Sequence, residues 1–166
     1  LMIKFATNKP ISMSSNTFTQ IYYHVVFAVK YRRSQIPMEK RDELYAYISG
    51  IVYRNDCRLM CIGGIGDHIH MLIRMAPTVC IANLVKSIKI ATTNYIAGRG
   101  YSPFKFHWQE GYGAFTVSAN HVAGVREYIN NQVEHHLNVS FIDEYKRILG
   151  KNDVAFDPQF IFKELE

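Results

Sequence analysis

Alternating and helical patterns of hydrophobic residues predict a strand, a helix and a hairpin in the first half of the chain. Residues 18–30 are dense in β-branched and aromatic side chains, which predicts a long strand. Apolar residues at helical spacing predict a helix over 38–55; they are Leu44, Ile48, Ile51 and Val52. The apolar segments 58–65 and 68–75 predict two strands that the Gly66-Asp67 turn joins into an antiparallel hairpin.

The second half predicts further helices around one short strand. The expected elements are a helix with Thr78 as N-cap and Gly98 beyond its end, a strand over 114–117, a helix from Ser118 or Asn120 to about His136, a short helix over 141–149 and an extended end at 160–162. The order β-α-β-β-α-β-α predicts an α+β fold, an antiparallel sheet with helices packed on one face. The opposite face would then carry chemistry or bind a nucleic-acid strand.

The composition fits one globular domain. The chain has 166 residues, of which 48% are hydrophobic and 20% charged, enough for a real core. The three cysteines lack Cys-x-x-Cys spacing, which disfavours a disulfide framework or a structural zinc site and predicts a reducing, cytoplasmic location. We expect no membrane partner, since no apolar stretch approaches the length of a spanning helix. Residues 1–16 differ in composition from the residues that follow. We interpret them as a leader that is disordered or foreign to the natural protein, with Met13 as a plausible natural start.

The charge and the aromatic content suggest a nucleic-acid partner. The net charge is +5, which favours a polyanion, and 21 tyrosines and phenylalanines (11 and 10) offer surfaces on which unpaired bases could stack, although most must be core. The predicted phosphate contacts are Lys30, Arg32, Arg33, Lys86, Lys89 and Lys105. For each of them the alternative is a solvated surface charge. Tyr112 is expected to serve loop packing or base stacking, and His107, His121 and His136 to be surface or cap residues.

His68 and His70 form a candidate metal-binding pair. If residues 68–75 are a strand, the two imidazoles point to the same face, because strand side chains alternate. Two neutral nitrogen ligands side by side are a common way to hold a divalent metal. The spacing alone equally allows two rings that are merely packed or solvated, so a metal site needs a third ligand elsewhere in the chain.

The helix predicted up to His136 has two distinct stripes. One is apolar and suited to packing on a sheet; the other contains His121, Gly124, Tyr128, Gln132 and His135. Tyr128 and Gln132 are four residues apart and therefore neighbours on one helical face. An ordinary interpretation is a partly buried tyrosine beside a solvated glutamine.

From about residue 17 onward, the sequence resembles the single-domain His-hydrophobe-His tyrosine transposases of small bacterial insertion sequences, the IS200-like family. The segments that carry the resemblance are His24-Val25-Val26-Phe27, Lys30-Tyr31-Arg32-Arg33, Gly66-Asp67-His68-Ile69-His70-Met71-Leu72, Leu84-Val85-Lys86, Trp108-Gln109-Glu110-Gly111-Tyr112 and Tyr128-Ile129-Asn130-Asn131-Gln132. The resemblance implies a fold related to RNA-recognition and ferredoxin-like domains, with a catalytic domain over 17–138 and a C-terminal extension, 139–166, packed on it. It also implies a homodimer in which the tyrosine helix can complete the partner's site.

The resemblance assigns the chemistry to four residues. His68, His70 and Gln132 would hold the metal, Mg²⁺ or Mn²⁺, and Tyr128 would attack single-stranded DNA at hairpin-bearing ends, leaving a 5′-phosphotyrosine and a free 3′-hydroxyl. A free tyrosine has a pKa of about 10, so its proton must go to an acceptor, either a water or His135. Two other functions stay open: a non-catalytic hairpin-binding protein derived from such an enzyme, and a metal-dependent hydrolase of a small phosphate ester.

Overall fold

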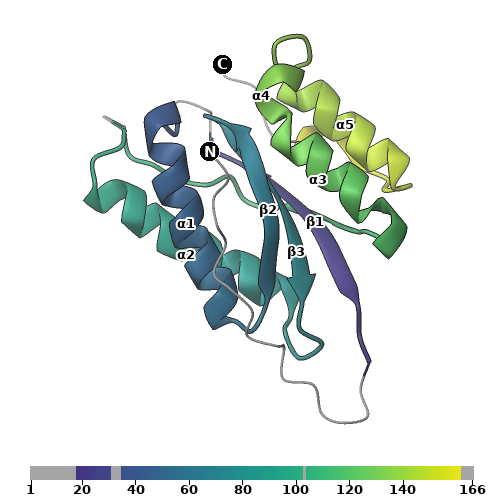
Figure 1. Cartoon of the computed structure of the whole chain (residues 1–166). Helices are drawn as coiled ribbons and strands as arrows, with labels where there is room; N and C mark the ends of the chain where they lie inside the picture. The colour runs from purple at the N-terminus through teal and green to yellow at the C-terminus, as the bar shows by residue number, and fades with distance from the viewer. Residues whose placement is uncertain (1–17, 31–34, 103, 162–166) are drawn as a thin grey trace.

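An antiparallel sheet forms the centre of the molecule (Figure 1). The structure, a computed structural model, describes residues 18–30, 35–102 and 104–161. In these residues the strands β1 (Ile21–Ala28), β2 (Arg58–Ile65), β3 (His68–Met75) and β4 (Gly113–Thr116) lie in the order β2-β3-β1-β4. The predicted hairpin is β2–β3, and β1 pairs with β3 over its whole length. The α+β class with an antiparallel sheet is therefore confirmed.

Two long helices cover one face of the sheet. They are α1 (Arg41–Arg54), preceded by the 3₁₀ turn η2 (Met38–Lys40), and α2 (Ile81–Gly98). Their apolar stripes bury against alternate residues of β1 and β3, such as Val25, Phe27, Ile69 and Met71. The order β-α-β-β-α-β in this strand arrangement is that of a ferredoxin-like unit. None of the helices in the described residues is both long and apolar enough to cross a bilayer.

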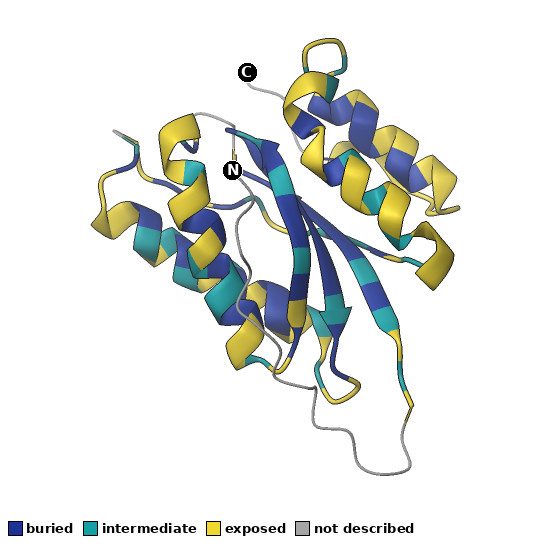
Figure 2. Ribbon diagram, viewed as in Figure 1, coloured by how far each residue is buried: buried dark blue, intermediate teal, exposed yellow. Residues whose placement is uncertain are grey.

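The sequence predicted that the other face of the sheet is open. That face instead carries three more helices (Figures 1 and 2). They are α3 (Val122–Asn130), which follows the turn η3 (Ala119–His121), then α4 (Gln132–His135) and α5 (Phe141–Lys151). The physical reason is that the sheet is apolar on both sides: Val26 and Leu72 point to this face and are fully buried there. The expectation of helices on one face only was therefore wrong.

Several element boundaries also differ from the sequence pattern. The N-cap of α2 is Cys80 rather than Thr78, without a side-chain cap, and Gly98 is its last residue. The helix predicted to run to His136 is interrupted at Asn131. Of the extended end expected at 160–162, Phe160 belongs instead to the 3₁₀ turn η4 (Pro158–Phe160), Ile161 is extended, and Phe162 lies outside the described residues. The division into leader, catalytic domain and extension stays a prediction, and the leader lies outside the described residues.

A glycine in β2 allows α3 to approach the sheet closely. A Cβ atom on Gly63 would lie 2.1 Å from the backbone oxygen of Ile129 in α3. We expect Gly63→Ala to destabilise the protein by about 1–3 kcal/mol, because backbone cannot give way like a flexible side chain. Urea unfolding measures the effect. Gly150→Ala is the control, since nothing lies within 4 Å of its Cβ position; an equal loss in both variants would contradict the close-approach explanation.

Candidate active site

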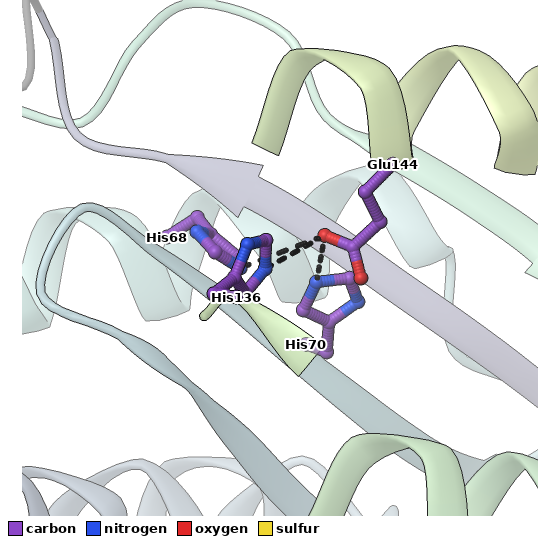
Figure 3. A group of neighbouring side chains, drawn as sticks. All are labelled: His68, His70, His136 and Glu144. Atoms are coloured by element: carbon purple, nitrogen blue, oxygen red, sulfur yellow. Dashed lines mark ion pairs between the residues drawn. The ribbon is translucent and has the colours of Figure 1, made fainter. Parts of the chain in front are cut away.

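Three imidazoles and one carboxylate converge between β3 and the helices that cover it (Figure 3). His68 and His70 point to the same face of β3, as their spacing predicted, while His136 follows α4 and Glu144 comes from α5. Glu144 Oε2 lies 3.0 Å from His136 Nε2, 3.4 Å from His70 Nε2 and 3.8 Å from His68 Nε2. One ligand atom from each of the four residues fits within 4.8 Å of the others.

The Nδ1 atom of each imidazole has its own partner outside the cluster. The three contacts are His68 Nδ1 to Asp67 Oδ1 at 2.7 Å, His136 Nδ1 to the Val139 carbonyl oxygen at 2.8 Å, and His70 Nδ1 to His24 Nε2 at 2.9 Å. Histidines that bind metals almost always use their second nitrogen in this way, which fixes the ring and its tautomer. With Nδ1 donating, each Nε2 presents its lone pair to the centre of the cluster.

Two buried atoms at the centre have no hydrogen-bond partner among the described residues, His70 Nε2 and Glu144 Oε2. Buried polar groups are nearly always paired, so both atoms call for a partner. Metal bonds of about 2.1 Å at angles between 90° and 130° separate neighbouring ligand atoms by about 3.0–3.8 Å. The observed separations from Glu144 Oε2 lie in this interval, so the carboxylate and each histidine are spaced like ligands of one divalent cation.

Burial and mutual contact set the charges in the cluster. Burial lowers the pKa of His70 to about 4 and that of His24 to about 3, which leaves both rings neutral near pH 7, the form that binds metal. Burial alone would raise the pKa of Glu144, but its close contacts with the His136 and His70 imidazoles hold it well below its usual range. For His136, burial works to lower the pKa, yet the contacts with Glu144 raise it above its usual value.

The structure brings Gln132 to the same cluster. Its side chain is buried, and Gln132 Oε1 lies 3.2 Å from His68 Nε2 and 3.1 Å from His136 Nε2. The amide nitrogen of Gln132 donates a hydrogen bond of 2.8 Å to Glu144 Oε1. An amide oxygen that faces two imidazole nitrogens is placed as a further oxygen donor to the same centre, and its role as a metal ligand stays a prediction.

Tyr128 adjoins the cluster through the same carboxylate. Its hydroxyl donates a hydrogen bond to Glu144 Oε1, and its ring stands edge-on to His70 with 5.9 Å between the ring centroids. Burial, followed by the contact with Glu144, raises the pKa of Tyr128 above its ordinary value. The phenol therefore keeps its proton until the surrounding charge changes, and Glu144 is the group positioned to receive it.

Two of the predicted phosphate contacts lie away from this cluster. Lys86 and Lys89 belong to α2, on the far face of the sheet, and Lys89 Nζ donates to the backbone oxygens of Gln109 and Gly111. Burial lowers the pKa of Lys89 to about 8. Lys30 and Lys105 are exposed, whereas Arg32 and Arg33 lie outside the described residues. All six contacts with DNA stay predictions.

Comparison with known proteins connects the chain to bacterial transposases. The family model "Transposase IS200 like" matches residues 17–132, more than two thirds of the chain. The chain belongs to this family. Among curated transposases, it is 29% identical over 121 residues to the ISDra2 transposase TnpA of Deinococcus radiodurans. The aligned region covers 68% of this chain and 84% of the relative. It is 30% identical over 117 residues to the IS200 transposase of Salmonella typhimurium, over 68% and 76% of the two chains.

Solved structures of transposases share the fold. A crystal structure described as a transposase of Deinococcus radiodurans matches with a TM-score of 0.58 and 25% identity, over 73% of this chain and 97% of that one. A REP-associated tyrosine transposase, solved bound to a REP hairpin, matches with a TM-score of 0.57 and 16% identity, over 87% and 93%. At that identity the second likeness shows the fold alone.

The transposase family match ends at residue 132, so His136 and Glu144 lie beyond it. Of the two alternatives expected for His136, a surface or a cap residue, the second is confirmed, since His136 is the C-cap of α4. The surface alternative was wrong: its side chain is 4% exposed and contacts Glu144. Glu144 was missed altogether. A signal existed for both, since His136 follows Gln132 by one helical turn, and Glu144 is a carboxylate on the apolar stripe that Phe141, Tyr145 and Ile148 form.

Asp67 offers a test of the metal-site interpretation in this transposase. Because its carboxylate orients His68 through Nδ1, we expect Asp67→Ala to weaken divalent-metal affinity by about 10- to 100-fold. Isothermal titration with Mn²⁺ measures the affinity. Asp153→Ala serves as the control, an exposed carboxylate beyond the end of α5. Unchanged Mn²⁺ affinity in Asp67→Ala would argue against His68 as a ligand.

Proposed function

We propose that this IS200-family protein cleaves and rejoins single-stranded DNA through a covalent bond to Tyr128. One observation carries the proposal: a single carboxylate, Glu144, touches both the tyrosine hydroxyl and the histidine cluster that fits a cation. A nucleophile is useful to phosphodiester cleavage only where the charge on the attacked phosphate is neutralised, so the two features belong to one site.

The proposed cation is Mg²⁺ or Mn²⁺. His68, His70 and Gln132 would hold it, as the family resemblance implies, and His136 with Glu144 would complete the set. Three imidazoles suit transition metals better than Mg²⁺, which prefers oxygen ligands, so the donor set weighs toward Mn²⁺. When bound, the cation would act as a Lewis acid that stabilises charge on the phosphate and favours the phenolate.

The chain's own groups account for the proton and the bonds. Tyr128 Oη attacks the phosphorus and its proton passes to Glu144 Oε1, the acceptor of its hydrogen bond. The bond from phosphorus to the 3′-oxygen breaks, which leaves a 5′-phosphotyrosine and, once protonated, a free 3′-hydroxyl. Attack by another 3′-hydroxyl reverses these steps, so no ATP is needed. Glu144 thereby replaces the two acceptors considered from sequence, a water and His135.

The proposed DNA substrate is a single strand with hairpin-bearing ends of an insertion sequence. The relatives named for insertion elements support an insertion sequence as the source of the DNA, and the single strand and the hairpin are proposals for this chain. The predicted homodimer also stays a proposal. Its expected role was to complete the site in trans, yet His70, Gln132, Tyr128 and Glu144 lie together within one chain, which favours a site assembled in cis. The cytoplasmic location stays a prediction.

The experiment is incubation with Mn²⁺ or Mg²⁺ and single-stranded DNA from the flanks of the encoding gene. We expect a covalent protein–DNA adduct that peptide mass spectrometry maps to Tyr128. Binding without any metal-dependent cleavage would favour the non-catalytic hairpin-binding protein instead. Cleavage without a covalent intermediate would favour a hydrolase.

A further inference from the structure

A cavity of about 420 Å³ opens beside Tyr128, between α3 and α5. Its polar walls include Tyr128, Glu144 and His121, and two cations from α5, Arg147 and Lys151, also line it. The volume lies in the range of small-ligand sites. We propose that this cavity binds the DNA strand next to the attacked phosphate, with Arg147 and Lys151 contacting its backbone phosphates. The inference rests on the proposed function and gives the helix α5, which lies beyond the family match, a role in substrate binding.

Charge is the first argument for a phosphate. Arg147 and Lys151 are four residues apart and therefore share one face of α5. Both are exposed, and within the described part of the chain no acidic residue forms an ion pair with either. Arginine also matches the geometry of a phosphate with two parallel hydrogen bonds. Two unpaired cations beside a nucleophile that must meet a phosphodiester are well placed to bind the neighbouring phosphates.

Proximity to the reacting group is the second argument. Arg147 and Tyr128 line the same cavity, so a strand bound there would meet the cation and the nucleophile together. In addition, the buried His135 Nε2 at the cavity wall lies 3.5 Å from Glu144 Oε1 but has no hydrogen-bond partner among the described residues. A polar group of the strand is a suitable partner for it.

The shape and polarity of the cavity favour a single strand over a duplex. Val125 and Ile148 give it apolar walls, and the Tyr128 ring adds an aromatic one. An unpaired base can enter such a space while its phosphate stays at the charged rim. A duplex keeps its bases paired and stacked, so it would offer only its backbone to Arg147 and Lys151.

The test is DNA binding by the full chain, measured apart from chemistry. In a Tyr128→Phe background with Mg²⁺ present, fluorescence anisotropy with an oligothymidylate about 15 nucleotides long gives the affinity across salt concentrations. We expect Arg147→Gln and Lys151→Gln each to weaken binding several-fold and to reduce the slope of log K against log[salt] by about 0.7 per phosphate contact. Lys146→Gln is the matched control, since Lys146 is exposed on the same helix and does not line the cavity.

The outcomes separate this inference from the proposed function. Equal losses of DNA affinity in Lys146→Gln and Arg147→Gln would show that only the net charge matters, which overturns the inference. Unchanged affinity in both Arg147→Gln and Lys151→Gln would overturn it as well. The same loss with a blunt duplex probe would overturn the assignment to a single strand. The binding measurement does not depend on cleavage. If the Arg147 and Lys151 variants bind DNA more weakly but the wild-type protein never forms an adduct, the proposed function is refuted and this inference stands.

Discussion

Tyr128→Phe should abolish the covalent DNA adduct, lowering its rate of formation by at least about a thousandfold, because removal of a nucleophile leaves no alternative route to the same bond. The variant keeps the aromatic ring, and Glu144 Oε1 still accepts a hydrogen bond from Gln132. Folding and DNA binding should therefore survive. A labelled single strand, resolved with the protein on a denaturing gel and checked by intact mass, measures the adduct.

Tyr112→Phe is the control for this prediction. Tyr112 lies between two glycines in a loop and could be mistaken for the nucleophile. Its side chain packs against the core on the side of α1 and α2. We expect its variant to form the adduct at the wild-type rate. An adduct that forms at full yield in Tyr128→Phe would show that another residue attacks the phosphate.

The local parts of the site could be predicted from the sequence. The alternation of side chains along a strand placed His68 and His70 on one face, and the helical spacing placed Tyr128 next to Gln132. Both rules depend on neighbours in sequence. Gln132 kept its place although the helix breaks at Asn131, because its oxygen meets His68 and His136 while its nitrogen meets Glu144. Tertiary contacts fix this residue where helix propensity does not.

The parts of the site that depend on distant segments could not be predicted. Glu144 reaches the histidines only because α5 docks on the second face of the sheet, where Phe141 and Tyr145 pack with Val26 and Phe115. No periodicity in the sequence specifies that docking. The sequence pattern also treated the face of β3 with His68 and His70 as open, since two imidazoles are polar. Their burial becomes tolerable once carboxylates and a neighbouring imidazole pair with them.

The clustered atoms around Glu144 explain why the fold places polar groups in its interior at all. His68, His70, Gln132 and Glu144 are all buried, and a buried polar network is costly unless its members are satisfied. The remaining unpaired atoms, His70 Nε2 and Glu144 Oε2, face each other at 3.4 Å. A cation would satisfy both at once, so metal binding should add to the stability of the folded state as well as to catalysis.

His70→Ala should therefore remove the metal site. The variant deletes one proposed ligand and also breaks the contact from His70 Nδ1 to His24 Nε2, so we expect Mn²⁺ affinity to fall by more than about 100-fold and the DNA adduct to disappear. Stability gives a readout independent of activity. At 100 times its dissociation constant, a ligand raises the free energy of unfolding by about 2.7 kcal/mol, and this gain should be present in the wild type and absent in His70→Ala.

His107→Ala separates the loss of a ligand from the loss of any histidine. His107 is exposed and lies on the loop before Trp108, outside the cluster of metal-capable residues. Its variant should retain both Mn²⁺ affinity and the gain in unfolding free energy. If Mn²⁺ stabilised His70→Ala as strongly as the wild type, the cation would bind elsewhere, and the convergence of His68, His136 and Glu144 would need a structural explanation.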